Sequence, residues 1–162
     1  MEGKLKTFLN NCKRLEDEFA DKTHDVENVN RGILVSEAFF IRSIIGNLKN
    51  FRIIESGRAM GQSTFLLGKI FPNNSIISIE MDKLHTDAKF ALDRLSKFNN
   101  VQCLFGDSKI MIPDLAKDND ILIIDGPKDM NALLLISSLC NLIRPRFVFI
   151  HDAYKGLSLI HI

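Results

Sequence analysis

Carboxylates and glycines follow five short apolar runs of the chain, and these residues could form a ligand site. The polar segments are ESGRAMGQST from residue 55, EMD from 80, GDS from 106, DGPK from 125 and HDAYKG from 151. A single acid or glycine at such a place is equally an ordinary loop or cap residue. Five in succession favour a ligand site, because carboxylates gathered at one edge repel each other unless ligands, cations or basic neighbours offset the repulsion.

The apolar runs are typical of strands buried on both faces of a parallel sheet. They span residues 51–54, 76–79, 101–105, 121–124 and 147–150, are rich in Ile, Val and Phe, and mostly lack strict alternation. Helical patterns lie between them, at residues 63–71, 83–98, 109–117 and 130–142. This order predicts a doubly wound α/β fold with five strands. Ligands bind outside the carboxyl ends of such strands, where the polar segments begin.

Two amphipathic patterns precede the predicted sheet. Apolar residues recur at helical spacing from Leu5 to Phe19 and again from Leu34 to Leu48, with a polar segment at residues 21–30 between them. We therefore expect an N-terminal helix and loop over residues 1–30, followed by one α/β domain over residues 31–162.

Composition argues against several classes of partner. The 162 residues are 46% apolar and 25% charged, as expected of one globular domain. A net charge of +1, one tyrosine and no tryptophan give no electrostatic or stacking basis for binding nucleic acid. The sequence has no signal-peptide core or membrane-length apolar run. Three distant cysteines predict buried free thiols in a reducing compartment, so we expect a cytoplasmic protein.

The segment from Glu55 to Thr64 is the most specific motif. Gly57 and Gly61 allow a sharp turn and close approach of the backbone to a ligand, and Ser63 or Thr64 can begin a helix whose amides face that ligand. The glycine spacing does not match the G-x-G-x-x-G of nicotinamide-binding loops, and the chain has no G-x-x-x-x-G-K-[ST] phosphate loop. What it matches is E-x-G-x-x-x-G.

With that motif the sequence resembles the class I S-adenosylmethionine-dependent methyltransferases, and most of all methyltransferase family 24. The resemblance covers roughly residues 31–156 and depends on RIIESGRAMGQSTFLL, SIISIEMD, FGDS, ILIIDGPK and FVFIHDAYKG in this order. It implies a Rossmann-like sheet that binds S-adenosylmethionine. It also implies an enzyme that methylates an oxygen, or less favourably a nitrogen, of a small-molecule or saccharide acceptor.

The resemblance also assigns residues to the cofactor. Glu55 and Gly57 would lie along its methionine portion, and Gly61 would let the chain pass close to it. Glu80 would accept hydrogen bonds from both ribose hydroxyls, for which a carboxylate is suited. Asp107 would lie near the adenine amino group.

Two neighbouring positions complete this assignment. Ser108 would stand beside the adenine together with the preceding aspartate. Ala59 replaces a glycine that is common in the cofactor loop of the family.

The ends of the last two predicted strands resemble those of cation-dependent O-methyltransferases. By that resemblance Asp125 and Asp152 would hold a divalent cation, Mg²⁺ or Ca²⁺, and Lys128 would be the general base toward an acceptor hydroxyl. His151 stands where the family has an aspartate, and Asp152 where it has an asparagine. A histidine at this place could ligate the metal, act as a base or be structural.

The family fold has seven strands, whereas five are evident here and the last two are missing. The edge at residues 147–150 would then be an apolar edge that needs cover. We expect it to be covered by a partner chain, giving a homodimer, or by the terminal segment 157–162. Two alternatives to a methyltransferase stay open. One is a non-catalytic or truncated module that binds the nucleoside cofactor or a protein partner, and the other, less favoured by the glycine spacing, is a nicotinamide-dependent oxidoreductase.

Overall fold

A single sheet forms the centre of the molecule. The computed structural model describes residues 2–29, 32–152 and 160–161. Its strands are β1 (Ile53–Ser56), β2 (Ile76–Glu80), β3 (Val101–Phe105), β4 (Ile121–Ile124), β5 (Phe147–Ile150) and β6 (Ile160–His161), in the spatial order β3-β2-β1-β4-β5-β6. The first five are parallel, which confirms the predicted doubly wound fold. The strand order reverses between β1 and β4, and open α/β sheets bind ligands at such a point.

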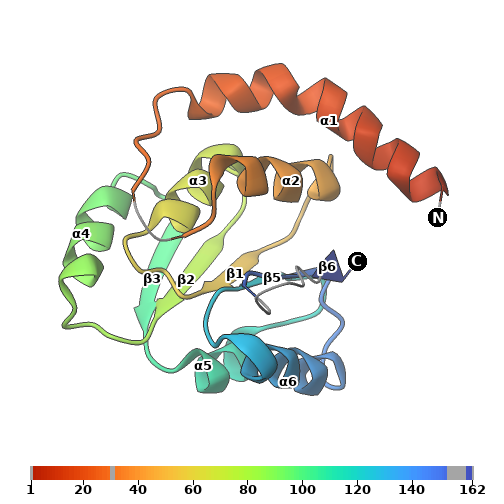
Figure 1. Cartoon of the computed structure of the whole chain (residues 1–162). Helices are drawn as coiled ribbons and strands as arrows, with labels where there is room; N and C mark the ends of the chain where they lie inside the picture. The colour runs from red at the N-terminus through yellow and green to blue at the C-terminus, as the bar shows by residue number, and fades with distance from the viewer. Residues whose placement is uncertain (1, 30–31, 153–159, 162) are drawn as a thin grey trace.

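Helices cover both faces of the sheet (Figure 1). They are α1 (Glu2–Thr23), α2 (Val35–Ile45), α3 (Gln62–Ile70), α4 (Thr86–Leu95), α5 (Ser108–Leu115) and α6 (Asp129–Cys140). Helices α2, α3 and α4 lie on one face and α5 and α6 on the other, each face with its own hydrophobic cluster. The predicted helices are all present, with ends that differ by a few residues.

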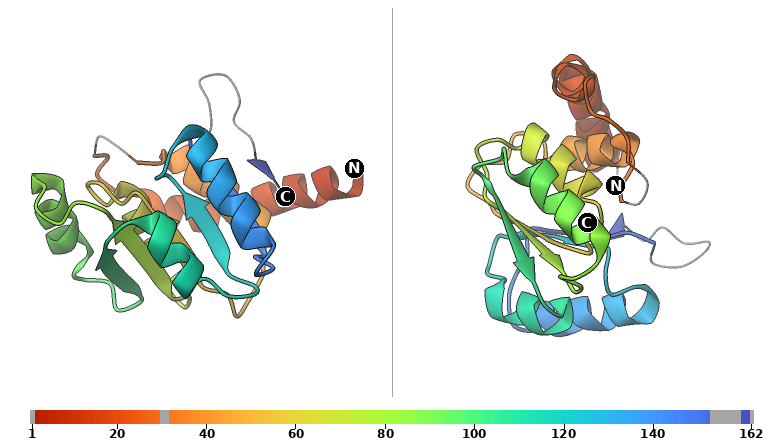
Figure 2. Two further views of the ribbon diagram at one scale, coloured as in Figure 1. Left: turned by 90° about the horizontal axis from the view of Figure 1, so that it is seen from below. Right: turned by 90° about the vertical axis from the view of Figure 1, so that its left-hand side faces the viewer.

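Helix α1 forms an additional layer outside α2 and α3 (Figure 2). Its ring contacts with α2 are edge-to-face, with centroids 5.3 Å apart for Phe8 and Phe40 and 5.0 Å apart for Phe19 and Phe39. The helix continues to Thr23, into the segment expected to be a loop. The expected domain boundary falls at residues 30–31, which lie outside the described residues.

The outer edge of β5 is paired with β6. Strand β6 runs antiparallel to β5, with His161 opposite Val148 and Ile160 opposite Phe149. The expected count of five strands was therefore one short, because a two-residue strand is too short to show a pattern. Of the two expected covers for this edge, the terminal segment is the one that the structure shows, through Ile160 and His161. The rest of that segment, residues 157–159 and 162, lies outside the described residues. The homodimer stays a prediction.

The cysteines and the helix lengths bear on two further expectations from composition. The cysteines are free, but the expectation that all are buried was wrong: Cys12 and Cys103 are half-buried and Cys140 is exposed. Cys140 is the last residue of α6 and lies outside the buried face of that helix, which Ala132, Leu135 and Leu139 form. No helix in the part of the chain that the structure describes has the length and apolar character needed to cross a membrane.

Candidate functional site

The loop after β1 is bent by its glycines. Gly57 has a φ of +84°, and a Cβ there would lie 2.8 Å from the carbonyl carbon of Asp125. Gly61 has a φ of +76°, and a Cβ there would press on Ala91 and Leu95 of α4 at 3.3 and 3.2 Å. Both positions therefore require glycine for the protein's own packing, Gly57 against the end of β4 and Gly61 against α4.

Glu80, at the end of β2, is held by backbone amides. Its Oε2 accepts a hydrogen bond from the N–H of Ala59 at 2.7 Å, and its Oε1 accepts one from the N–H of Met81 at 2.8 Å. The carboxylate is thereby fixed between the β1 loop and the β2 loop. Ala59 has a φ of +44°, in the left-handed region that favours glycine, which explains why glycine suits this position.

A cavity of about 200 Å³ opens beside this carboxylate. It is lined by Ala59, Glu80, Asp82, His85, Asp87 and Ala88. Three of these residues are acidic, and no lysine or arginine is among the lining residues, so the cavity suits a neutral or cationic ligand better than a phosphate. Sequence analysis did not single out His85 and Asp87. His85 is the N-cap of α4 and its Nδ1 accepts the N–H of Asp87 at 3.2 Å.

Glu55 lies inside the protein rather than on the surface of the loop. It is fully buried, and its Oε2 accepts hydrogen bonds from the hydroxyls of Thr64 and, at 2.7 Å, Ser78. Its Oε1 has no hydrogen-bond partner among residues 2–29, 32–152 and 160–161. Burial raises the pKa of the Glu55 carboxyl, against the lowering effect of hydrogen bonds from neighbouring hydroxyls. Its contact with a cofactor stays a prediction.

The residues after β3 connect that strand end to its neighbours. Asp107 caps α5 by accepting the N–H of Lys109 at 2.9 Å, and the Ser108 hydroxyl donates to the carbonyl of Gly126 at 2.9 Å. Ser108 therefore joins the end of β3 to the end of β4. Both residues lie at the carboxyl edge where the resemblance puts adenine, and that assignment stays a prediction.

A buried arginine, to which no sequence motif pointed, attaches the β1 loop to the neighbouring strands. Arg58 is fully buried, and its Nη1 donates to the carbonyls of Ser78 at 2.6 Å and Leu104 at 3.2 Å. The guanidinium also lies over the ring of Phe105, 4.7 Å from the centroid. These contacts attach the β1 loop to β2 and β3. Within the described part of the chain, Nε and Nη2 have no hydrogen-bond partner.

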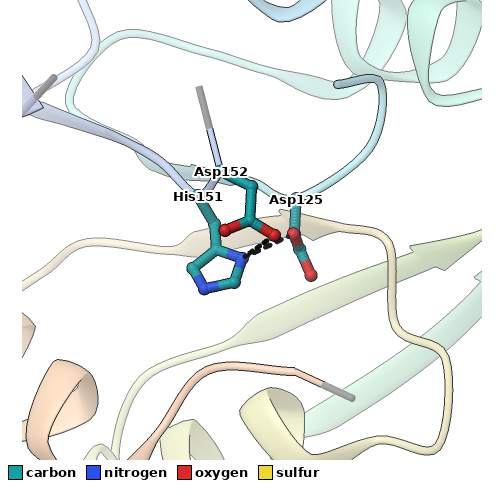
Figure 3. A group of neighbouring side chains, drawn as sticks. All are labelled: Asp125, His151 and Asp152. Carbon is teal, nitrogen blue, oxygen red and sulfur yellow. Dashed lines mark hydrogen bonds and ion pairs between the residues drawn. The ribbon is translucent and has the colours of Figure 1, made fainter. Parts of the chain in front are cut away.

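The ends of β4 and β5 bring together four predicted residues, Asp125, Lys128, His151 and Asp152. Figure 3 shows Asp125, His151 and Asp152. His151 Nδ1 lies 2.8 Å from Asp125 Oδ1 and 3.4 Å from Asp152 Oδ2. The Lys128 ammonium forms ion pairs with Asp125 and, at 3.3 Å, with Asp152. Asp125, His151 and Asp152 each offer one ligand atom, and these atoms lie within 4.8 Å of one another.

The carboxylates shift the pKa values of both basic groups. The hydrogen bond to Asp125 raises the pKa of the His151 imidazole, and partial burial opposes that rise. Burial acts to lower the pKa of Lys128, but its contacts with Asp125 and Asp152 outweigh burial and raise it. Lys128 is therefore a cation at neutral pH in this arrangement.

Glu37 joins the group from α2, and no sequence signal placed it there. Its Oε1 lies 3.4 Å from His151 Nε2, and its Oε2 accepts the N–H of Leu34 at 2.6 Å. The imidazole is thus held by carboxylates at both nitrogens. The only local signal is the position of Glu37 three residues after the N-cap Leu34, which is typical of a helix start.

A second cavity, of about 110 Å³, lies next to this imidazole. Its lining consists of Ile33, Glu37, Phe40, Ile41, Ile123, Phe149, Ile150, His151 and Asp152. The wall is apolar and the rim carries two carboxylates and the imidazole. A small, largely apolar molecule with one polar group would match this lining.

Comparison with known proteins identifies the fold. No protein-family model matches the sequence, and no curated protein matches it significantly. Among solved structures, the O-methyltransferase TomG from Streptomyces achromogenes, in complex with SAM, superposes with a TM-score of 0.62 at 17% identity, covering 83% of this chain and 63% of TomG. The fold is that of the class I S-adenosylmethionine-dependent methyltransferases.

Two further structures share this methyltransferase fold. SAH-bound PaMTH1 from Podospora anserina has a TM-score of 0.59 at 15% identity, covering 85% of this chain and 61% of PaMTH1. A putative caffeoyl-CoA O-methyltransferase from Staphylococcus aureus has a TM-score of 0.57 at 21% identity, covering 87% of this chain and 66% of that protein. The chain therefore spans less than two thirds of each of these methyltransferases.

Proposed function

We propose that this chain binds S-adenosylmethionine at the carboxyl ends of β1, β2 and β3 and transfers its methyl group to an oxygen of a small acceptor. The observation that carries the proposal is the carboxylate of Glu80. Two backbone amides hold it at the edge of a cavity that has three acidic residues and no lysine or arginine in its lining. A fixed carboxylate can accept both hydroxyls of a ribose, and an acidic cavity favours a sulfonium cofactor over a phosphorylated one.

The other residues that would hold the cofactor lie along the same edge. Gly57 and Gly61 shape the loop, Glu55 lies beneath it, and Asp107 and Ser108 begin α5 beside it. S-adenosylmethionine, when bound, supplies an electrophilic methyl group. The fold supports this assignment, because TomG is in complex with SAM and PaMTH1 is SAH-bound.

We assign the acceptor to the cavity beside His151. Its apolar wall would exclude water and hold the body of the acceptor, and the rim would bind the hydroxyl to be methylated. Asp125 holds Nδ1 of His151, so Nε2 is the nitrogen that reaches the cavity rim at Glu37. An acceptor hydroxyl that displaced Glu37 from Nε2 would have a proton acceptor in place.

Calorimetric titration with S-adenosylhomocysteine tests the cofactor assignment. Wild type should bind, and Glu80→Gln should bind roughly ten- to a hundredfold more weakly, as expected for loss of a charge-assisted hydrogen-bond pair. Glu16→Gln, on the exposed face of α1, is the matched control and should bind like wild type. Absence of binding to wild type, or equal binding by Glu80→Gln, would contradict the proposal. Binding of NADH instead would favour an oxidoreductase.

A screen for release of S-adenosylhomocysteine with small hydroxyl-bearing acceptors tests the transfer step. Turnover that His151→Asn abolishes while cofactor affinity is kept would assign the acceptor site. Tight cofactor binding with no turnover on any acceptor would instead favour the alternative of a non-catalytic module.

A further inference from the structure

The side chains at the ends of β4 and β5 do not fit the divalent cation that the resemblance to cation-dependent methyltransferases implies. A metal there would need Asp125 Oδ1 and Asp152 Oδ2 as ligands. Both oxygens already contact the Lys128 ammonium, and both lie within 3.4 Å of His151 Nδ1. A cation between the two carboxylates would have to displace an ammonium that is itself positive.

The candidate ligand atoms are also not those that Mg²⁺ or Ca²⁺ prefers. These ions prefer sets of oxygen ligands, and Mg²⁺ requires a near-octahedral arrangement. Here a histidine stands in the place of one oxygen donor, and imidazole suits transition metals better than either hard cation. The third carboxylate nearby, Glu37, contacts the far side of the imidazole ring and does not face the other two.

We propose that the Lys128 ammonium occupies the place of a cation between the carboxylates of Asp125 and Asp152. It excludes a divalent metal and supplies the positive charge that the metal would supply. Lys128 bridges the carboxylates of Asp125 and Asp152 and so offsets the repulsion between them, which a metal would otherwise do. Lys128 precedes α6 as its N-cap residue, so its backbone is fixed by the first turn of that helix.

The role of Lys128 toward a substrate rests on the proposed function. In a methyltransferase, the ammonium would hold the carboxylates of Asp125 and Asp152 at Nδ1 of His151. That leaves Nε2 of His151, rather than Lys128, to take the proton of the acceptor. The exclusion of metal does not depend on that role, because it follows from the ion pairs of the protein alone.

The test is a calorimetric titration of the full chain with MnCl₂ and MgCl₂, without cofactor or acceptor. Wild type should show no binding at millimolar metal. Lys128→Gln removes the ammonium from both carboxylates, and the affinity of the variant for Mn²⁺ should rise by at least about tenfold, because a contacting like charge is removed. Lys128→Arg keeps the charge and should behave like wild type. Lys109→Gln, which removes a lysine beside the single carboxylate of Asp107, is the matched control.

A second variant locates any metal that binds. Adding Asp125→Asn to Lys128→Gln should abolish the gained affinity, whereas a gain that persists would place the metal elsewhere and overturn the proposal. Submillimolar binding of Mg²⁺ or Mn²⁺ by wild type would also overturn it, and so would a Lys128→Gln variant that is folded by circular dichroism yet gains no affinity. Titration with S-adenosylhomocysteine judges the proposed function separately, so the two proposals fail independently.

Discussion

The backbone N–H of Ala59 donates to the carboxylate of Glu80 across 2.7 Å while Ala59 itself has a φ of +44°. The residue is thus held in a left-handed conformation at the point where the β1 loop meets the end of β2. A side chain at such a φ costs about 1–2 kcal/mol, whereas glycine adopts it freely. The hydrogen bond to Glu80 is therefore made against a local conformational cost.

Ala59→Gly should stabilise the protein. The relief of the left-handed strain exceeds the entropy that glycine adds to the unfolded chain, so we expect the free energy of unfolding to rise by up to about 1 kcal/mol. Urea denaturation measures this change. Ala20→Gly, at an exposed position in α1, is the control and should lower stability by about 0.5–1 kcal/mol. Equal losses in both variants would show that Ala59 is not strained.

Most of the sheet could be predicted from the sequence because its strands are buried on both faces. Residues 121–124 read ILII and are all buried in β4, which is the pattern that a central parallel strand produces. The strand β6 could not be predicted, since two residues carry no periodicity. Helix α1 extends past the predicted helical pattern through Asp21 to Thr23, whose buried hydroxyl donates to the carbonyl of Phe19, and the apolar spacing of the sequence does not mark this end.

The part of the site that could be predicted is the part that the strand order brings to one edge of the sheet. Asp125 and His151 follow adjacent strands, so their contact follows from the topology. Glu37 belongs to a helix whose placement over β5 has no signal in the sequence. Arg58 reads as a loop residue, and its burial depends on the carbonyls of Ser78 and Leu104, which only the folded sheet brings within reach.

Glu55→Gln should change how stability depends on pH. Burial raises the pKa of this carboxyl above 4.5 in the folded protein, so the folded state binds a proton more tightly than the unfolded state. Its contribution to stability is fully present below pH 4.5 and is lost as the pH rises through the folded pKa. We therefore expect wild type to lose more stability than Glu55→Gln between pH 4.5 and neutrality. Urea unfolding at several pH values measures this difference, with the exposed Glu16→Gln as control; parallel curves for the variant and wild type would contradict it.

His151 provides a second pH-dependent contribution to the free energy of unfolding. NMR can follow the protonation of its imidazole. Its pKa is raised above 6.5, first by the hydrogen bond to Asp125. The associated stabilisation is fully present below pH 6.5 and is lost as the pH rises through the folded pKa, because only the imidazolium is attracted to the carboxylates. Asp125→Asn should lower the imidazole pKa, and Asp17→Asn, on the exposed face of α1, should leave it as in wild type. An imidazole pKa that Asp125→Asn does not lower would mean that Glu37 and Asp152, rather than Asp125, dominate the charge at this site.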